Sequence, residues 1–121
     1  MKNTARLWTG FVGPALLWFT HLEITYSLHP SACDAKSELM LWITTIILLA
    51  CVALIGAMTL AMWRANPDPH PTGAAGAPEE EEVRSNGRAR FMAAAGFASA
   101  CLFGLAILVH VIPMVVLRPC D

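Results

Sequence analysis

Hydrophobic positions along the chain fall into three long runs separated by two polar connections. The runs cover about residues 7–28, 39–63 and 91–117. A helix needs about 20 consecutive apolar residues to cross the hydrocarbon core of a bilayer, and each run is long enough. The pattern therefore predicts an all-α fold, an integral membrane bundle of three transmembrane helices that forms a single membrane domain over residues 1–121.

The two connections differ in length and in composition. The first, about residues 29–38, is short, so the first two helices are expected to pack as antiparallel neighbours. The second, about residues 65–89, contains Pro67, Pro69, Pro71 and Pro78, a Gly-Ala stretch and the acidic run from Glu79 to Glu82. Such a composition buries too little apolar surface to order itself, and we predict a mobile cytoplasmic loop.

Basic residues set the predicted orientation, because cytoplasmic segments of membrane proteins carry an excess of Lys and Arg. The N-terminal tail and the second connection hold six basic residues, whereas the first connection and the C-terminal tail hold two. In that order they are Lys2, Arg6, Arg64, Arg84, Arg88 and Arg90, against Lys36 and Arg118. We therefore expect a multi-pass protein of the bacterial cytoplasmic (inner) membrane, with its N-terminus cytoplasmic and its C-terminus periplasmic.

Composition excludes several classes of function. Apolar residues make up 56% of the chain and charged residues 14%, and the charges cluster between the runs. No basic patch with interleaved aromatic residues is present, so no nucleic-acid partner is expected. No Gly-rich phosphate loop, nucleophile elbow or zinc-protease helix is present either. We expect a non-enzymatic protein whose main partner is the lipid bilayer.

The first run also resembles a secretory signal, because Lys2 and Arg6 precede an apolar stretch. Three features oppose cleavage: Pro30 stands where a small residue is wanted, the run is long, and His21 and Glu23 interrupt it. Pro30 also opposes a lipoprotein signal ending at Cys33. We expect this run to remain as the first helix.

Cysteine positions predict a disulfide. Cys33 follows the first run and Cys120 follows the last, so both are expected on the periplasmic side, where thiols are oxidised. A bond between them would clamp the first and third helices together. Cys51 and Cys101 lie in the middle of their runs and are expected to be inert apolar residues. The chain has no Cys-x-x-Cys arrangement, which opposes a catalytic dithiol.

Ionisable residues inside the runs are the candidate functional residues. His21 and His110 each lie about seven residues before the outer end of a helix, roughly 10 Å deep at about 1.5 Å per residue. Two histidines at one depth on two helices can meet. Glu23 points nearly opposite to His21 at about 100° per residue. The predicted intramembrane polar cluster is His21, Glu23, Tyr26, Thr44, Thr45 and His110.

Three interpretations of this cluster remain open. His21 and His110 can ligate haem b, because two imidazoles form a common axial pair. Alternatively, copper can bind His110 and Met114, one turn apart, with His29, Cys33, Cys120 and Asp121 as further soft or polar ligands. The favoured interpretation has no metal or cofactor: His21 and His110 bond each other or backbone carbonyls, and Glu23 is neutral or pairs with a residue of a larger complex.

Small residues at four-residue spacing predict close helix packing, either within a bundle or against another subunit. Helices in lipid associate through close backbone approach and polar contacts. The third run offers Gly96, Ala100 and Gly104, and the second offers Ala53, Ala57 and Ala61. Gly10, Gly13 and Pro14 predict that the cytoplasmic end of the first helix is kinked or closely packed.

Two segments carry a resemblance to a known group. The first is Trp8-Thr9-Gly10-Phe11-Val12-Gly13-Pro14-Ala15, continuing to His21-Leu22-Glu23, Tyr26-Ser27-Leu28 and Cys33. The second is Val109-His110-Val111-Ile112-Pro113 with Leu117-Arg118-Pro119-Cys120. Together they resemble small uncharacterised three-helix bacterial membrane proteins encoded beside cytochrome c oxidase genes. The resemblance implies an accessory subunit or assembly factor of a respiratory haem-copper oxidase complex, with other membrane subunits as partners. The alternative is a small haem- or copper-binding membrane redox protein that uses His21 and His110.

Overall fold

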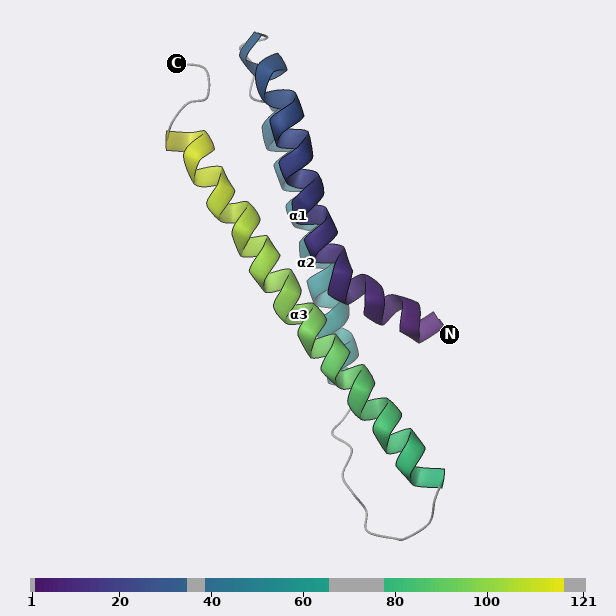
Figure 1. Ribbon diagram of the computed structural model, residues 1–121. Coiled ribbons are helices and arrows are strands. Elements are labelled where there is room, and N and C mark those ends of the chain that lie inside the picture. Colours follow the sequence, from purple (N-terminus) through teal and green to yellow (C-terminus); the bar gives the residue numbers. More distant parts are fainter. Residues whose placement is uncertain (1, 35–38, 66–77, 117–121) are drawn as a thin grey trace.

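The chain forms three long helices, as the three apolar runs predict. A computed structural model describes residues 2–34, 39–65 and 78–116, and the side chains of residues 2, 3, 32, 33 and 78–83 are not described. The helices are α1 (Lys2–Asp34), α2 (Leu39–Ala65) and α3 (Pro78–Val116). Each helix contacts both of the others, so the described residues form an all-helical three-helix bundle (Figure 1).

Two helix boundaries differ from the expectation. The helix α1 continues through Pro30 to Asp34, so most of the predicted first connection is helical. The helix α3 begins at Pro78 rather than near residue 91, and the acidic run lies in its first turns. Proline is tolerated at the first position of a helix. Carboxylates in the first turn interact favourably with the positive end of the helix dipole. Figure 1 shows these turns extending past the ends of α1 and α2.

The helix α1 is bent in its N-terminal half, and Pro14 is the internal proline of that half. Sharp bends in helices are usually caused by proline. Figure 1 shows the N-terminal part of α1 turning away from the axis of the rest of the helix. Proline lacks the N–H that would bond the carbonyl four residues earlier, and its ring crowds that carbonyl. Pro14 therefore frees the carbonyl of Gly10, and its ring is buried against the bundle. The sequence predicted either a kink or close packing in this segment, and the structure shows a bend and a buried Pro14 ring.

The three helices approach most closely beside this bend. A Cβ atom built on Gly96 of α3 would lie 3.1 Å from the carbonyl carbon and oxygen of Gly10 and 3.1 Å from Cγ2 of Thr59 on α2. A Cβ on Gly10 would likewise collide with Cγ2 of Thr59. Only residues without a side chain fit at this crossing, which fixes the depth at which the helices meet.

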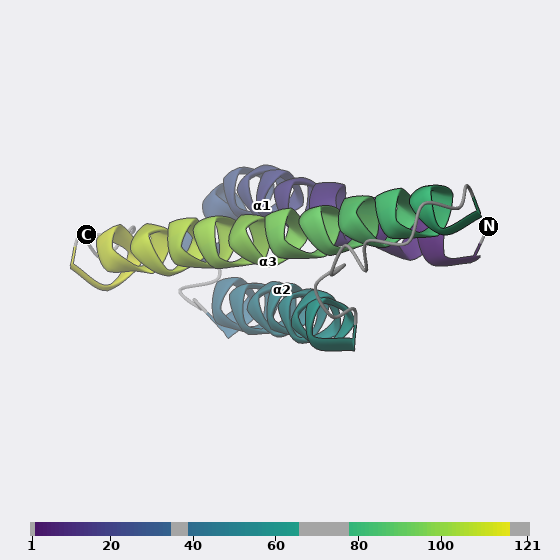
Figure 2. The same cartoon turned by 90° about the horizontal axis from the view of Figure 1, so that it is seen from below.

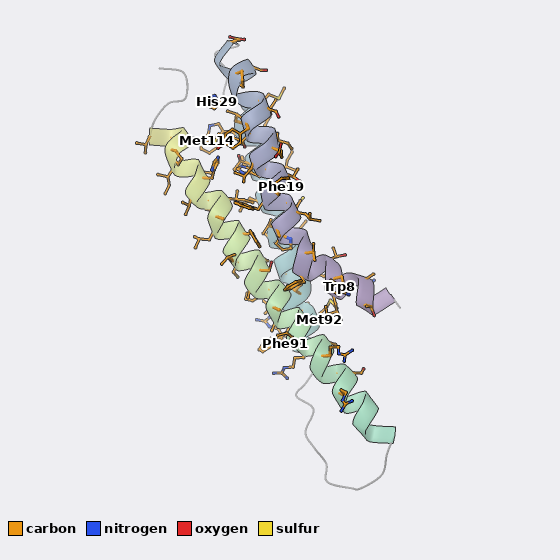
Figure 3. The ribbon with its side chains drawn as sticks, viewed as in Figure 1. Trp8, Phe19, His29, Phe91, Met92 and Met114 are labelled. Atoms are coloured by element: carbon orange, nitrogen blue, oxygen red, sulfur yellow. The ribbon has the colours of Figure 1, made fainter. Side chains whose placement is uncertain are left out.

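Large apolar side chains cover the outside of the bundle, and the interior is small and partly polar. The fully buried side chains include His21, Thr59 and Pro14 beside Leu41 and Ile107. The large apolar side chains that are more than half exposed occur on all three helices: Trp8, Leu16, Phe19, Tyr26, Leu39, Met40, Ile46, Ile47, Leu54, Phe91, Leu102, Leu105, Val109, Ile112, Val115 and Val116. Figure 2 views the bundle from below, and Figure 3 shows the side chains projecting outward from the three ribbons.

Length and composition allow two of the helices to cross a bilayer. These are α2, in which a stretch of 18 residues has a mean hydropathy of 2.6, and the part of α3 from Arg84 to Val116, in which such a stretch has a mean hydropathy of 2.3. Among the described residues no third helix meets the same measure, because polar groups lower the hydropathy of α1.

Candidate functional site

A buried polar contact joins all three helices near the end of the bundle that carries Asp34 and Val116. His21 of α1 is completely buried, and its Nε2 lies 3.1 Å from Oγ1 of Thr45 on α2. The His21 ring also meets the ring of His110 on α3 edge to face, with 5.4 Å between ring centroids. The two histidines that were predicted to lie at the same depth in the membrane are therefore in contact.

The hydrogen bonds of Thr45 determine the tautomer of His21. The single hydroxyl proton of Thr45 is donated to the carbonyl of Leu41 at 2.9 Å. The oxygen can then only accept from His21, so Nε2 carries the proton and Nδ1 presents a lone pair. Nδ1 has no hydrogen-bond partner among the described residues. The His21 side chain is thus a neutral imidazole that is fixed by one hydrogen bond. Its Nδ1 is an unused acceptor inside the described part of the bundle.

The remaining members of the predicted polar cluster take no part in the contact between His21, Thr45 and His110. Thr44 donates to the carbonyl of Met40 in its own helix at 2.9 Å and does not reach His21. Glu23 and Tyr26 are exposed, and Tyr26 is 76% exposed. The expected opposition of His21 and Glu23 is resolved with His21 facing inward and Glu23 facing outward. Thr25, which is buried one turn after His21, was not among the predicted residues.

The geometry of the two histidines does not fit haem. Two axial imidazoles must each direct a nitrogen at an iron between them, with the macrocycle separating the rings. Here the rings are in direct edge-to-face contact, and Nε2 of His21 is engaged by Thr45. A macrocycle would have to pass through that contact, so the haem interpretation of His21 and His110 conflicts with this packing.

The two predicted small-residue stripes behave differently. Gly96, Ala100 and Gly104 are buried, with Ala100 facing Gly56 and Gly104 facing Val52. Ala53, Ala57 and Ala61 are exposed, and α2 instead packs through Val52, Gly56 and Thr59. Of the two stripes, only that of α3 therefore packs inside this bundle, and contact of the α2 stripe with another subunit stays a prediction. Ala53 and Ala57 line a shallow apolar groove of about 400 Å³ between α2 and α3.

Ser99 is a packing residue that sequence reasoning missed. Its Oγ donates to the carbonyl of Phe11 across the α1–α3 interface at 3.1 Å. Bending at Pro14 loosens the carbonyls of the preceding turn, and a hydroxyl from a neighbouring helix can satisfy one of them. A serine within an apolar run, three residues after the small residue Gly96, was the available signal.

The predicted disulfide partners lie outside the described residues, since the side chain of Cys33 and all of Cys120 are not described. The end of α1 that contains Cys33 and the end of α3 that precedes Cys120 lie at the same end of the bundle (Figure 1). Cys51 and Cys101 carry free thiols. The pairing of Cys33 with Cys120 stays a prediction.

We expect the disulfide to appear as a change in accessible thiols. Denatured protein treated with maleimide–polyethylene glycol should label at Cys51 and Cys101 before reduction and at all four cysteines after it. The Cys33→Ser variant should expose Cys120 to the reagent without reduction. Identical gel shifts with and without reductant would mean that Cys33 and Cys120 are not bonded to each other.

Comparisons with known proteins give no further identity. No family model, no curated protein and no solved structure matches this chain.

Proposed function

We propose that this protein is a three-span integral membrane protein, with its N-terminus cytoplasmic and its C-terminus periplasmic. The observation that carries the proposal is the inverted distribution of side chains. The imidazole of His21 and the hydroxyls of Thr45 and Thr59 are buried, whereas Leu16, Phe19 and Leu54 are more than half exposed. Water would penalise such a surface, but lipid accepts it and makes interior polar contacts favourable.

The exposed threonines support a lipid environment for α1 as well as α2. Thr9, Thr20 and Thr44 each donate to the backbone carbonyl four residues earlier, at 2.9, 2.8 and 2.9 Å. A hydroxyl bonded to its own helix needs no water and can face hydrocarbon. The hydroxyls of Thr9 and Thr20, which lower the hydropathy of α1, are thus satisfied within their own helix.

A basic and aromatic contact supports the cytoplasmic boundary. The guanidinium carbon of Arg90 on α3 lies 5.1 Å from the ring centroid of Trp63 on α2. Indole rings concentrate at the membrane interface, and Arg concentrates on the cytoplasmic side. This contact supports a proposed boundary that crosses α2 and α3 at one level, beside Arg64.

We further propose that the protein is a non-enzymatic accessory subunit or assembly factor of a respiratory haem-copper oxidase complex. The proposal rests on the resemblance of its first and last segments, together with Glu23. A carboxyl on the apolar outer face of α1 is costly in lipid, and such groups pair with a partner. Glu23 therefore marks the face of α1 that contacts another membrane subunit.

Replacing the carboxyl should weaken that contact. We expect the Glu23→Gln variant, expressed in its native membranes and purified through a tag in mild detergent, to retain about tenfold less of the co-purifying subunits. This corresponds to about 1.4 kcal/mol of lost pairing. The measurement is a subunit gel of the purified fraction with a reduced-minus-oxidised absorbance spectrum, in which haem a reports the oxidase.

Asp34→Asn is the matched control, because Asp34 is also an exposed carboxyl of α1 but stands at the last residue of the helix. It should leave the co-purifying subunits unchanged. Equal recovery from Glu23→Gln and the parent would remove Glu23 from the interface. Absence of haem a and of large subunits from the parent preparation would refute the oxidase association itself.

A further inference from the structure

A partly enclosed cavity lies at the end of the bundle formed by the C-terminal turns of α1 and α3. Its volume is about 310 Å³. Figure 3 labels His29 on α1 and Met114 on α3 at this end of the bundle. The lining residues are Thr25, Tyr26, His29, Leu41, His110, Pro113 and Met114. Two imidazoles and one thioether thus converge on one space from two helices.

The position of the donors follows from helix geometry. His110 and Met114 are four residues apart on α3, so they lie on one face of that helix. His29 reaches the same cavity from α1. The His110 ring is held from behind by the edge-to-face contact with His21, which Thr45 fixes in turn. One ligand of the set is therefore positioned before any ion arrives.

We propose that this cavity binds one Cu(I) ion through His29, His110 and Met114. The donor set decides the metal. Among the described residues no carboxylate lines the cavity, which opposes the hard cations that prefer oxygen, and a thioether with imidazoles suits Cu(I). Met114 lines the cavity beside the two histidines and supplies the third donor through its thioether sulfur.

The surroundings suit a monovalent ion near the membrane surface. His29 is exposed and lies close to the end of α1, which gives the ion a route from outside the bundle. Leu41 and Pro113 supply apolar walls that limit access of water. Because the imidazoles and the thioether are neutral, the occupied site carries only the single positive charge of Cu(I). The site goes beyond the proposed oxidase association and does not depend on it.

Competitive titration tests the site. Full-length protein in detergent is titrated with Cu(I) against a chromogenic Cu(I) chelator under reductant. We expect one tightly bound ion per chain and an X-ray absorption spectrum with two nitrogen scatterers and one sulfur scatterer. Met114→Leu and His110→Ala should each weaken Cu(I) binding by at least about tenfold. Mutation of residues that only hydrogen-bond to a metal ligand already lowers metal affinity by about 10–100-fold. Met114→Leu keeps the side-chain volume, so it tests the sulfur without a cavity.

Two controls keep the proposal falsifiable, because thiols also bind Cu(I). Met92→Leu is the same substitution on α3 outside the cavity and should leave the affinity unchanged. A variant with Cys33→Ser, Cys120→Ser, Cys51→Ala and Cys101→Ala should still bind one ion. Loss of binding in the cysteine variant, or full affinity in Met114→Leu and His110→Ala, would overturn the proposal, as would a spectrum without sulfur in the cysteine variant.

Discussion

Gly96→Val should destabilise the bundle by about 1–3 kcal/mol, the usual cost of overpacking a well-packed interior. A Cβ at this position would lie 3.1 Å from the backbone of Gly10 and from Thr59, and valine adds two more methyl groups. The Gly10 backbone belongs to the bend at Pro14, and Thr59 is held by hydrogen bonds to the carbonyls of Ile55 and Gly56. Neither neighbour can yield without separating the helices.

The measurement is the unfolding free energy in mixed micelles, as the fraction of a denaturing detergent is raised. Ala98→Val is the matched control, because Ala98 lies on the exposed side of the same turn of α3 and the new side chain is the same. Gly96→Ala should fall between them. Equal unfolding midpoints for Gly96→Val and Ala98→Val would show that the helices do not cross at Gly96.

His21→Ala should cost about 2–4 kcal/mol, within the range for removing a large buried side chain. The imidazole is fully buried, so its loss leaves a cavity between the three helices and removes the edge-to-face contact with His110. Micelle unfolding measures this loss. A variant as stable as the parent would mean that His21 lies outside the packed interior.

The hydrogen bond from His21 to Thr45 can be separated from packing by a double-mutant cycle. Thr45→Val keeps the shape of the side chain but leaves the Nε2–H of His21 without an acceptor, and an interhelical bond in a membrane contributes about 0.6–1.7 kcal/mol. We expect a coupling energy in that range between His21→Ala and Thr45→Val. Thr44→Val removes a similar hydroxyl that bonds only its own helix, so it should show no coupling to His21. Zero coupling at Thr45 would contradict the bond.

Pro14 of α1 and the residues Gly96 and Ser99 of α3 act on two adjacent backbone carbonyls of α1. Pro14 removes the bond to the carbonyl of Gly10, and α3 brings Gly96 against that carbonyl and the hydroxyl of Ser99 to the next one. A bent helix with open carbonyls would be unfavourable alone in lipid. The hydrogen bond from Ser99 therefore stabilises the bend from α3 and couples these two helices.

The candidate site could be anticipated only in part. The equal depth of His21 and His110 follows from counting residues, and their rings do meet. The sequence could not show whether Thr44 or Thr45 accepts the hydrogen bond from His21. The two threonines are adjacent and differ only in the face of α2 on which they lie. About 100° of helix rotation separates them, and the packing of α2 decides which one faces inward.

Sequence by itself determined that the chain is helical, how many helices it forms and which residues are apolar enough for lipid, because hydrophobic run length depends only on local composition. It did not determine where α3 begins or which face of α2 is buried. The tertiary structure decided these, and with them the exposure of Ala53, Ala57 and Ala61 and the gathering of His29, His110 and Met114 around one cavity. The physical reason is that in an apolar helix every face is acceptable to lipid, so the rotation of each helix is set by close contacts such as Gly10 with Gly96, and those contacts exist only in the assembled bundle.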